Sequence, residues 1–222
     1  MVVKKPVPGM VKMRLTPYLR PEESARLYRA FMEDIISSLS KRRFQLIVSF
    51  FPPGDSGWIR KIVGESTILY PQVGKDLGQR LYNAFLRAFE DGYERVVAVC
   101  SDCPDLPPRL IHEAFISLKE YKSVLGPSHD GGYYLIGFRR GELVRSTLEN
   151  VAMSRPDTAE RTINCLEKEG HHPKILESWM DVDEPDDLKR FKKRYSLERG
   201  PPHTMDVVEN IFEKRDDGNR AE

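Results

Sequence analysis

Short runs of apolar residues alternate along this chain with longer segments in which apolar residues recur every third or fourth position. The short runs lie at residues 44–51, 67–70, 96–99, 123–127 and 133–137, and the periodic segments at residues 21–39, 76–92, 107–118 and 158–168. The first pattern predicts strands and the second predicts amphipathic helices. Because the two alternate, we expect an α/β fold with a mostly parallel sheet and helices on both faces.

The sequence of 222 residues is long enough for one α/β domain with a large core. We assign residues 1–197 to this domain, since a last predicted helix begins near Pro185. Residues 198–222 are polar and contain a break at Gly200-Pro201-Pro202. They are predicted to form a C-terminal tail with a short helix near residues 205–214.

The charge balance narrows the classes of function. The 35 Lys and Arg residues nearly match the 34 Asp and Glu residues, which gives a net charge of +1. Nucleic-acid-binding domains usually carry a clear basic excess, so we do not expect a nucleic acid as partner. No apolar run approaches the length of a membrane span, and residues 1–5 lack the apolar core of a signal peptide. We therefore expect a cytoplasmic protein.

The apolar run at residues 96–99 predicts a buried parallel strand that runs directly into Ser101-Asp102-Cys103-Pro104. Ligands of open α/β sheets bind outside the carboxyl ends of the strands, and a carboxylate there can hold a divalent cation against phosphate oxygens. Asp102 is therefore the first candidate for a site residue. The alternative is that Asp102 caps the helix that begins near Pro107. Cys100 and Cys103 form a C-x-x-C pair, which we interpret as incidental because a structural zinc site needs about four ligands.

A cationic loop follows the first short apolar run, Val2-Val3. Pro8 and Gly9 shape the loop, and Lys4, Lys12 and Arg14 supply its positive charge. Such a loop suits a polyphosphate, because Arg matches phosphate geometry and Lys adds a point charge. The alternative is a solvated basic N-terminus.

Gly78 lies at the start of a predicted helix, in the segment Asp76-Leu77-Gly78-Gln79-Arg80. Asp76 is a plausible N-cap. Gly78 and Arg80 are candidates for nucleotide binding, since ligands often lie at helix N-termini. An exposed arginine and a closely packed glycine would explain the same residues.

Two acidic motifs come later in the chain. Asp130 precedes Gly131-Gly132 at the start of a predicted strand, where either a ligand site or an Asp-Gly turn is expected. Asp183 is a plausible N-cap for the helix near Pro185. That cap leaves Asp181 unexplained, and an extended Asp-x-Asp points both carboxylates to one side, where they could meet a cation.

Taken together, these motifs resemble the GT-A superfamily of nucleotide-diphospho-sugar transferases, and more closely its DUF2064 branch. They are also similar to small nucleotidyltransferases. The resemblance is carried, in family order, by residues 4–15, 76–81, 101–106, 126–137 and 181–188. It implies a Rossmann-like sheet in which Lys12 and Arg14 neutralise phosphate and Asp102 binds Mg²⁺ or Mn²⁺. Asp183 is implied as a second metal ligand, and Asp130 with its two glycines as part of the acceptor site.

The main hypothesis is a metal-dependent transferase that uses an activated nucleotide, either a nucleotide sugar or a nucleoside triphosphate, and a small-molecule acceptor. The sequence does not distinguish glycosyl from nucleotidyl transfer, because both need the same metal and phosphate site. The alternative is a non-catalytic nucleotide-binding module. It is motivated by Met13, which stands where the family usually has Thr, and by the very short first strand.

Overall fold

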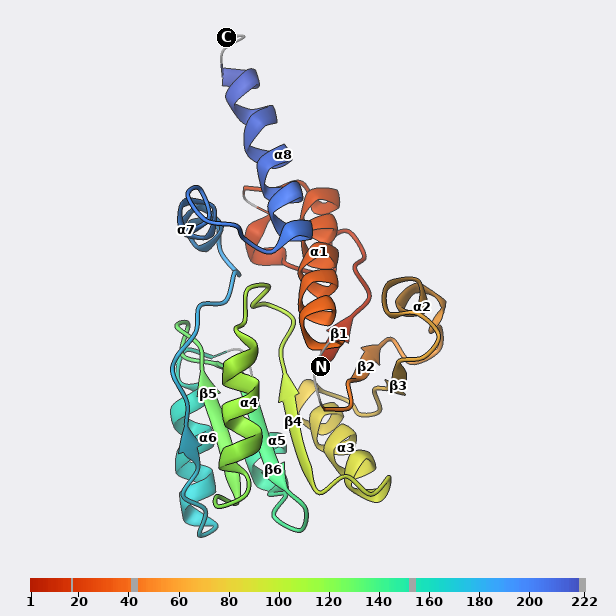
Figure 1. Cartoon of the computed structure of the whole chain (residues 1–222), viewed down its shortest axis with the longest axis vertical. Coiled ribbons are helices and arrows are strands. Elements are labelled where there is room, and N and C mark those ends of the chain that lie inside the picture. The colour runs from red at the N-terminus through yellow and green to blue at the C-terminus, as the bar shows by residue number, and fades with distance from the viewer. Residues whose placement is uncertain (17, 41–43, 152–154, 220–222) are drawn as a thin grey trace. The chain divides into compact units, whose positions relative to one another are not determined.

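The computed structural model describes residues 1–16, 18–40, 44–151 and 155–219 (Figure 1). The chain divides into two compact units, each assembled from separate segments. The sheet unit contains Met1–Val3, Leu46–Cys100 and Leu106–Asp181, and the helical unit contains Lys4–Gln45, Ser101–Asp105 and Val182–Glu222. The prediction of one domain over residues 1–197 and a tail over 198–222 did not anticipate these units.

The strands form two ladders. The first consists of β1 (Val2–Lys4), β2 (Ile47–Phe51) and β3 (Ile68–Pro71). These strands lie in the order β1-β2-β3, and β2 runs parallel to β3. The second consists of β4 (Arg95–Val99), β5 (Ser123–Pro127), β6 (Tyr133–Arg139) and β7 (Lys174–Ile175). These strands lie in the order β4-β6-β5-β7. In the second ladder β6 is antiparallel to β4 and β5, while β5 is parallel to β7.

The predicted α/β class with a mostly parallel sheet is confirmed, because β4, β5 and β7 share one direction and only β6 opposes them in that ladder. One detail of the prediction is wrong: β4 was expected to be a buried strand with parallel neighbours. Its partner in the ladder is the antiparallel β6, and only Val99 of the strand is fully buried. An apolar run identifies a strand but not the direction of its neighbour.

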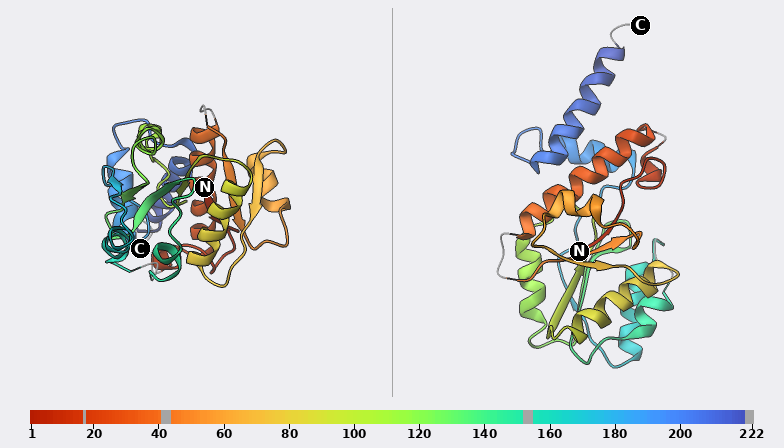
Figure 2. Two further views of the ribbon diagram at one scale, coloured as in Figure 1. Left: turned by 90° about the horizontal axis from the view of Figure 1, so that it is seen from below. Right: turned by 90° about the vertical axis from the view of Figure 1, so that its right-hand side faces the viewer.

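Helices cover both faces of the second ladder within the sheet unit (Figure 2). α4 (Pro108–Ser117) lies on one face, and α3 (Leu77–Glu90), α5 (Arg145–Glu149) and α6 (Thr158–Lys168) lie on the other. A buried apolar cluster joins α3, β6, α5 and α6; it includes Phe85, Phe138, Leu148 and Leu166. Neither α5 nor α2 (Gly57–Val63) is predicted from the sequence, because helices of five and seven residues are too short to display a helical period.

The helical unit contains a short 3-10 helix, η1 (Met13–Leu15), and three α-helices, α1 (Pro21–Ser40), α7 (Pro185–Arg194) and α8 (Pro202–Asn219). α8 packs against α1 and buries Val207, Val208 and Ile211. The buried Asp34 of α1 accepts hydrogen bonds from the amides of His203 and Thr204 at 3.1 and 2.7 Å. Residues predicted to be a tail therefore form an 18-residue helix, which an acidic side chain of another helix caps.

Among the residues that the structure describes, no helix is both long enough and apolar enough to cross a membrane. No disulfide involves Cys100, Cys103 or Cys165.

Candidate functional site

The cationic loop between β1 and η1 is held in place by its own backbone and by Lys4. The amide of Met10 donates to the carbonyl of Val7 at 3.0 Å, and Lys4 Nζ donates to the carbonyl of Met10 at 2.9 Å. Buried Val11 and Leu15 anchor the chain on either side of Lys12. The loop is therefore a defined structure and not a solvated basic terminus.

Lys12 has an unusual backbone. Its φ and ψ are 48° and 43°, the left-handed region, and it is the one non-glycine residue with a positive φ among the described residues. This conformation costs a β-carbon-bearing residue about 1–2 kcal/mol. It turns the lysine side chain inward, where it is only 3% exposed.

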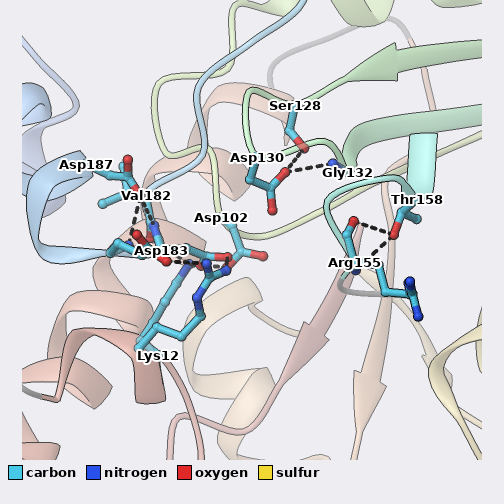
Figure 3. Close-up of polar contacts among 12 residues, drawn as sticks. Lys12, Asp102, Ser128, Asp130, Gly132, Arg155, Thr158, Val182, Asp183 and Asp187 are labelled. Atoms are coloured by element: carbon cyan, nitrogen blue, oxygen red, sulfur yellow. Dashed lines mark hydrogen bonds and ion pairs between the residues drawn. The ribbon is translucent and has the colours of Figure 1, made fainter. Parts of the chain in front are cut away.

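The buried Lys12 ammonium contacts three oxygens of the helical unit (Figure 3). Its Nζ lies 2.5 Å from Asp102 Oδ1, 2.6 Å from Asp183 Oδ1 and 2.8 Å from the carbonyl oxygen of Val182. An ammonium has three N–H donors, so these three acceptors satisfy it. The structure thus brings together Lys12, Asp102 and Asp183, three of the residues that the sequence analysis singles out. Their roles in binding stay predictions.

The two aspartates keep Lys12 charged. Burial by itself would lower the pKa of Lys12, but the charges of Asp102 and Asp183 and their hydrogen bonds outweigh it, and the pKa is raised. Burial would raise the pKa of Asp183, but the Lys12 ammonium, with a smaller effect from Arg14, lowers it. Lys12 and Asp183 are therefore both ionised near neutral pH.

Asp183 reaches Lys12 because another residue caps α7. The N-cap is Glu184, and the Asp187 carboxylate accepts from the amides of Glu184 and Asp183 at 2.8 and 3.2 Å. The expectation that Asp183 itself caps this helix is wrong. A capping box formed by Glu184 and Asp187 satisfies the free amides and leaves the Asp183 side chain available for Lys12.

Asp102 is also not a helix cap, because the N-cap of α4 is Pro107. The segment that carries Asp102 is joined to the segment before α7 by a backbone hydrogen bond, from the amide of Val182 to the carbonyl of Asp102 at 3.0 Å. This bond holds the two aspartate-bearing segments side by side. The alternative role for Asp102 is thus excluded by the structure.

Arg14 lies at the solvent side of the same group. Its side chain is 57% exposed, its Nη1 lies 3.8 Å from Asp183 Oδ2, and its Nη2 forms an ion pair with Glu184. The neighbouring Met13 is 55% exposed. An exposed guanidinium can exchange a surface carboxylate for a phosphate at little cost.

A buried hydroxyl pair, which the sequence does not predict, lies next to Asp102. Tyr28 Oη accepts from the amide of Lys4 at 3.1 Å and is 2.8 Å from Ser101 Oγ. Burial, together with the nearby charge of Asp102, raises the pKa of Tyr28 to about 12. In the sequence Tyr28 fits the apolar period of α1, so only the tertiary structure reveals its contact with the loop.

These side chains line a cavity of about 310 Å³ within the helical unit. Its lining consists of Lys4, Met10, Val11, Lys12, Met13, Arg14, Tyr28, Ser101, Asp102 and Asp183. Three of them are cationic and two are carboxylates. The volume is at the lower end of the range for small-molecule sites. Pro8 and Gly9, also predicted to bind nucleotide, belong to the same loop but are not part of this lining.

The other predicted nucleotide-binding residues, Gly78 and Arg80, belong to the sheet unit. A β-carbon at Gly78 would lie 2.0 Å from the carbonyl oxygen of Leu148, so the close contact of α3 with α5 requires glycine. Arg80 stacks on the Phe51 ring, with its guanidinium carbon 4.2 Å from the ring centre. Asp76 caps α3 as predicted. Nucleotide binding by Gly78 and Arg80 stays a prediction.

The predicted acceptor residues form a turn in the sheet unit. Asp130 Oδ1 accepts from Ser128 Oγ at 2.5 Å and from the amide of Gly132 at 2.8 Å (Figure 3). Gly131 has a φ of +86°. Asp181, the extra acid of the Asp-x-Asp motif, is buried in the same unit. The turn accounts for the Asp-Gly-Gly sequence, and an acceptor role for it stays a prediction.

The profile of a protein family described as uncharacterized proteins conserved in bacteria, DUF2064, matches residues 35–155 of the chain. A solved structure from Desulfovibrio desulfuricans G20, provisionally described as a nucleotide-diphospho-sugar transferase, is 32% identical to the chain, covers 95% of both chains and has a TM-score of 0.83. The chain belongs to the DUF2064 family. The resemblance found in the sequence is thereby confirmed.

More distant structures share the fold of this DUF2064 protein. One is 4-diphosphocytidyl-2C-methyl-D-erythritol synthase from Anaerococcus prevotii, with 10% identity, 89% and 97% of the two chains covered, and a TM-score of 0.55. Another is CMP:2-keto-3-deoxy-manno-octonic acid synthetase complexed with CTP, with 11% identity, the same coverage and a TM-score of 0.52. At such identities the likeness shows the fold alone. Among curated proteins, none matches the chain.

Proposed function

We propose that this chain is a metal-dependent transferase that takes its donor group from an activated nucleotide. The observation that carries the proposal is the convergence of the Asp102 and Asp183 carboxylates on one cation, at the wall of a cavity that Lys4 and Arg14 also line. This combination of carboxylates and cations suits a nucleotide diphosphate held together with a metal ion. The transferase description of the structure from Desulfovibrio desulfuricans G20, which is 32% identical to the chain, supports the same class.

The donor set fits Mg²⁺ or Mn²⁺. Both ions prefer oxygen ligands, and the point now held by Lys12 Nζ is faced by two carboxylate oxygens and by the carbonyl oxygen of Val182. Asp102 and Asp183 would hold the ion. When bound, it would offset the negative charge that develops on the diphosphate leaving group.

The remaining charges would act on the donor phosphates directly. Arg14 is exposed and offers a planar fork for two phosphate oxygens, and Lys4 and Lys12 add point charges from the loop. These groups would stabilise the leaving group as its charge grows. With a nucleoside triphosphate, an acceptor phosphate attacks the α-phosphorus and pyrophosphate leaves. With a nucleotide sugar, an acceptor hydroxyl attacks the anomeric carbon and a nucleoside diphosphate leaves.

A second candidate function is a nucleotide-binding module without turnover. The observation that favours it is Met13, whose exposed thioether side chain offers no hydroxyl beside Arg14. The module would bind a nucleotide with the same loop and release it unchanged.

A screen of nucleoside triphosphates and nucleotide sugars by thermal shift, with and without Mn²⁺, tests the proposal. A donor should raise the melting temperature, and the rise should be larger with Mn²⁺ present. Product analysis with a panel of acceptors then separates pyrophosphate release from nucleoside diphosphate release. A ligand that binds tightly but is never converted would favour the module, and a chain that binds no nucleotide would contradict both functions.

A further inference from the structure

The position between Asp102 and Asp183 is already filled by a cation that the chain itself supplies. Lys12 Nζ lies within 2.8 Å of Asp102 Oδ1, Asp183 Oδ1 and the Val182 carbonyl oxygen, and its side chain is 3% exposed. A divalent ion bound to the same oxygens would lie about 2.0–2.6 Å from each of them. An ammonium and a metal ion therefore cannot both occupy this point.

We propose that Lys12 is an internal counter-ion that holds the carboxylate pair in the nucleotide-free protein, and that a divalent cation enters only when donor phosphates draw Lys12 away. The inference rests on the proposed function, since the phosphates are the second partner of Lys12. It adds an order of events: the free protein binds the metal weakly, and the nucleotide and the metal bind cooperatively.

Electrostatics supports this exchange. Two carboxylates carry a charge of −2, which Lys12 offsets in part and a divalent ion would offset in full. If Lys12 stayed in place, a positive charge of +1 would lie within a few ångströms of the incoming ion in a buried, weakly screened position. Each charge would then weaken the binding of the other. Transfer of the ammonium to a phosphate removes the repulsion and gives Lys12 a new anionic partner.

The local structure allows Lys12 to move. Its charge is at the end of four methylene groups, whose rotation moves the ammonium without a change in the backbone. Val11 and Leu15, which anchor the loop, are buried independently of the ammonium. The side chain can therefore turn from the carboxylates to a ligand in the cavity without unfolding the loop.

The experiment is a measurement of Mn²⁺ affinity without nucleotide, by calorimetry or by electron paramagnetic resonance of the free ion. The variant is Lys12→Met, which keeps an unbranched side chain and removes the charge. Arg14→Met and Lys4→Met are matched controls, because each removes one positive charge from the same cavity lining. Lys12→Met should bind Mn²⁺ on the order of tenfold more tightly than the unmodified protein, and each control should change by less than about threefold.

Several results would overturn the inference. One is an unchanged or weaker Mn²⁺ affinity in Lys12→Met, and another is an equal gain in Arg14→Met, which would indicate a general effect of net charge. A third is a gain that survives in the double variant Lys12→Met with Asp102→Asn, because the ion would then bind elsewhere.

Removal of Lys12 leaves two half-buried carboxylates without their partner and will lower stability. A second readout therefore uses thermal unfolding: Mn²⁺ should raise the melting temperature of Lys12→Met by more than it raises that of the unmodified protein. A different result would show that the proposed function is wrong while the inference about Lys12 holds. In that case no nucleotide binds in the presence of Mn²⁺, but Lys12→Met still binds Mn²⁺ more tightly than the unmodified protein.

Discussion

Two aspartates that each follow a predicted strand have very different surroundings. Asp102, in the helical unit, pairs with Lys12, which lies 90 residues earlier in the chain. Asp130, in the sheet unit, accepts hydrogen bonds from Ser128 and Gly132, each two residues away. The first carboxylate has a partner brought from a distant segment, and the second is satisfied by its own turn.

The difference bears on function. A local turn that uses Asp130 as an acceptor stabilises the backbone and needs no other explanation. A group of one buried lysine and two half-buried aspartates contributes little net stability, because the cost of taking these charges out of water offsets their attraction. Such a group beside a cavity is a candidate for a functional site. The following predictions test this contrast, beginning with the largest expected effect.

Gly131→Ala should lower the free energy of unfolding by about 4 kcal/mol, because overpacking and a left-handed alanine each cost about 1–3 kcal/mol. A β-carbon at Gly131 would lie 1.8 Å from the carbonyl oxygen of Pro156, and φ is +86°. Urea unfolding measures the change. Gly141→Ala is the control, since Gly141 has a φ of +81° but open space around it, and should cost about 1 kcal/mol. An equal loss of unfolding free energy in the two variants would mean that the turn at Asp130 shifts to make room for the added β-carbon.

Asp102→Asn should weaken the binding of the donor nucleotide with Mn²⁺ by roughly a hundredfold, since it removes one of two carboxylates from the cation site. Asp130→Asn makes the same chemical change in the sheet unit and should leave donor binding within about threefold. Calorimetry with the donor found in the nucleotide screen measures both. A hundredfold loss in both variants would remove the contrast between the two aspartates.

Stability should fall at alkaline pH in part through Tyr28. The unfolded chain loses the phenolic proton near pH 10 and the folded chain near pH 12. Between these values the folded state binds more protons, so its stability decreases as the pH rises, by on the order of 2 kcal/mol for this one group. Tyr28→Phe should remove this share of the decrease. Urea unfolding at pH 9 and pH 11.5 tests it, and equal pH dependence in both proteins would contradict the prediction.

Much of the fold follows from local pattern. Amphipathic periods locate α1, α3, α4 and α6, and apolar runs locate most strands, because burial imposes these periods directly. The antiparallel course of β6 could also have been predicted, because residues 128–132 are too short a connection for the crossover that a parallel neighbour needs. The length of α8 could not, because its cap is Asp34, a residue of another helix.

The residues of the candidate site, too, can be predicted from the sequence only in part. Residue type and position at a strand end indicate Asp102, and a charged loop with Pro and Gly indicates Lys12 and Arg14. The N-cap prediction for Asp183 was wrong, although the sequence contains the evidence against it: Glu184 and Asp187 have the spacing of a capping box. Tyr28 could not be found, because its position in the period of α1 suggests only a core residue.

The smallest expected effect belongs to Asp130→Ala, which should lower the free energy of unfolding by about 1 kcal/mol. It removes the acceptor for the Ser128 hydroxyl and for the Gly132 amide. The amide is partly exposed and can turn to water, so the cost comes from the hydroxyl of the buried Ser128. Asp130→Asn keeps one carbonyl oxygen and should cost less. Steady-state kinetics with the acceptor gives the deciding measurement. If Asp130 serves only the turn, the two variants differ in stability but not in KM for the acceptor. A raised acceptor KM in both, with donor binding unchanged, would give Asp130 the acceptor role that the resemblance implies and place a second functional carboxylate in the sheet unit.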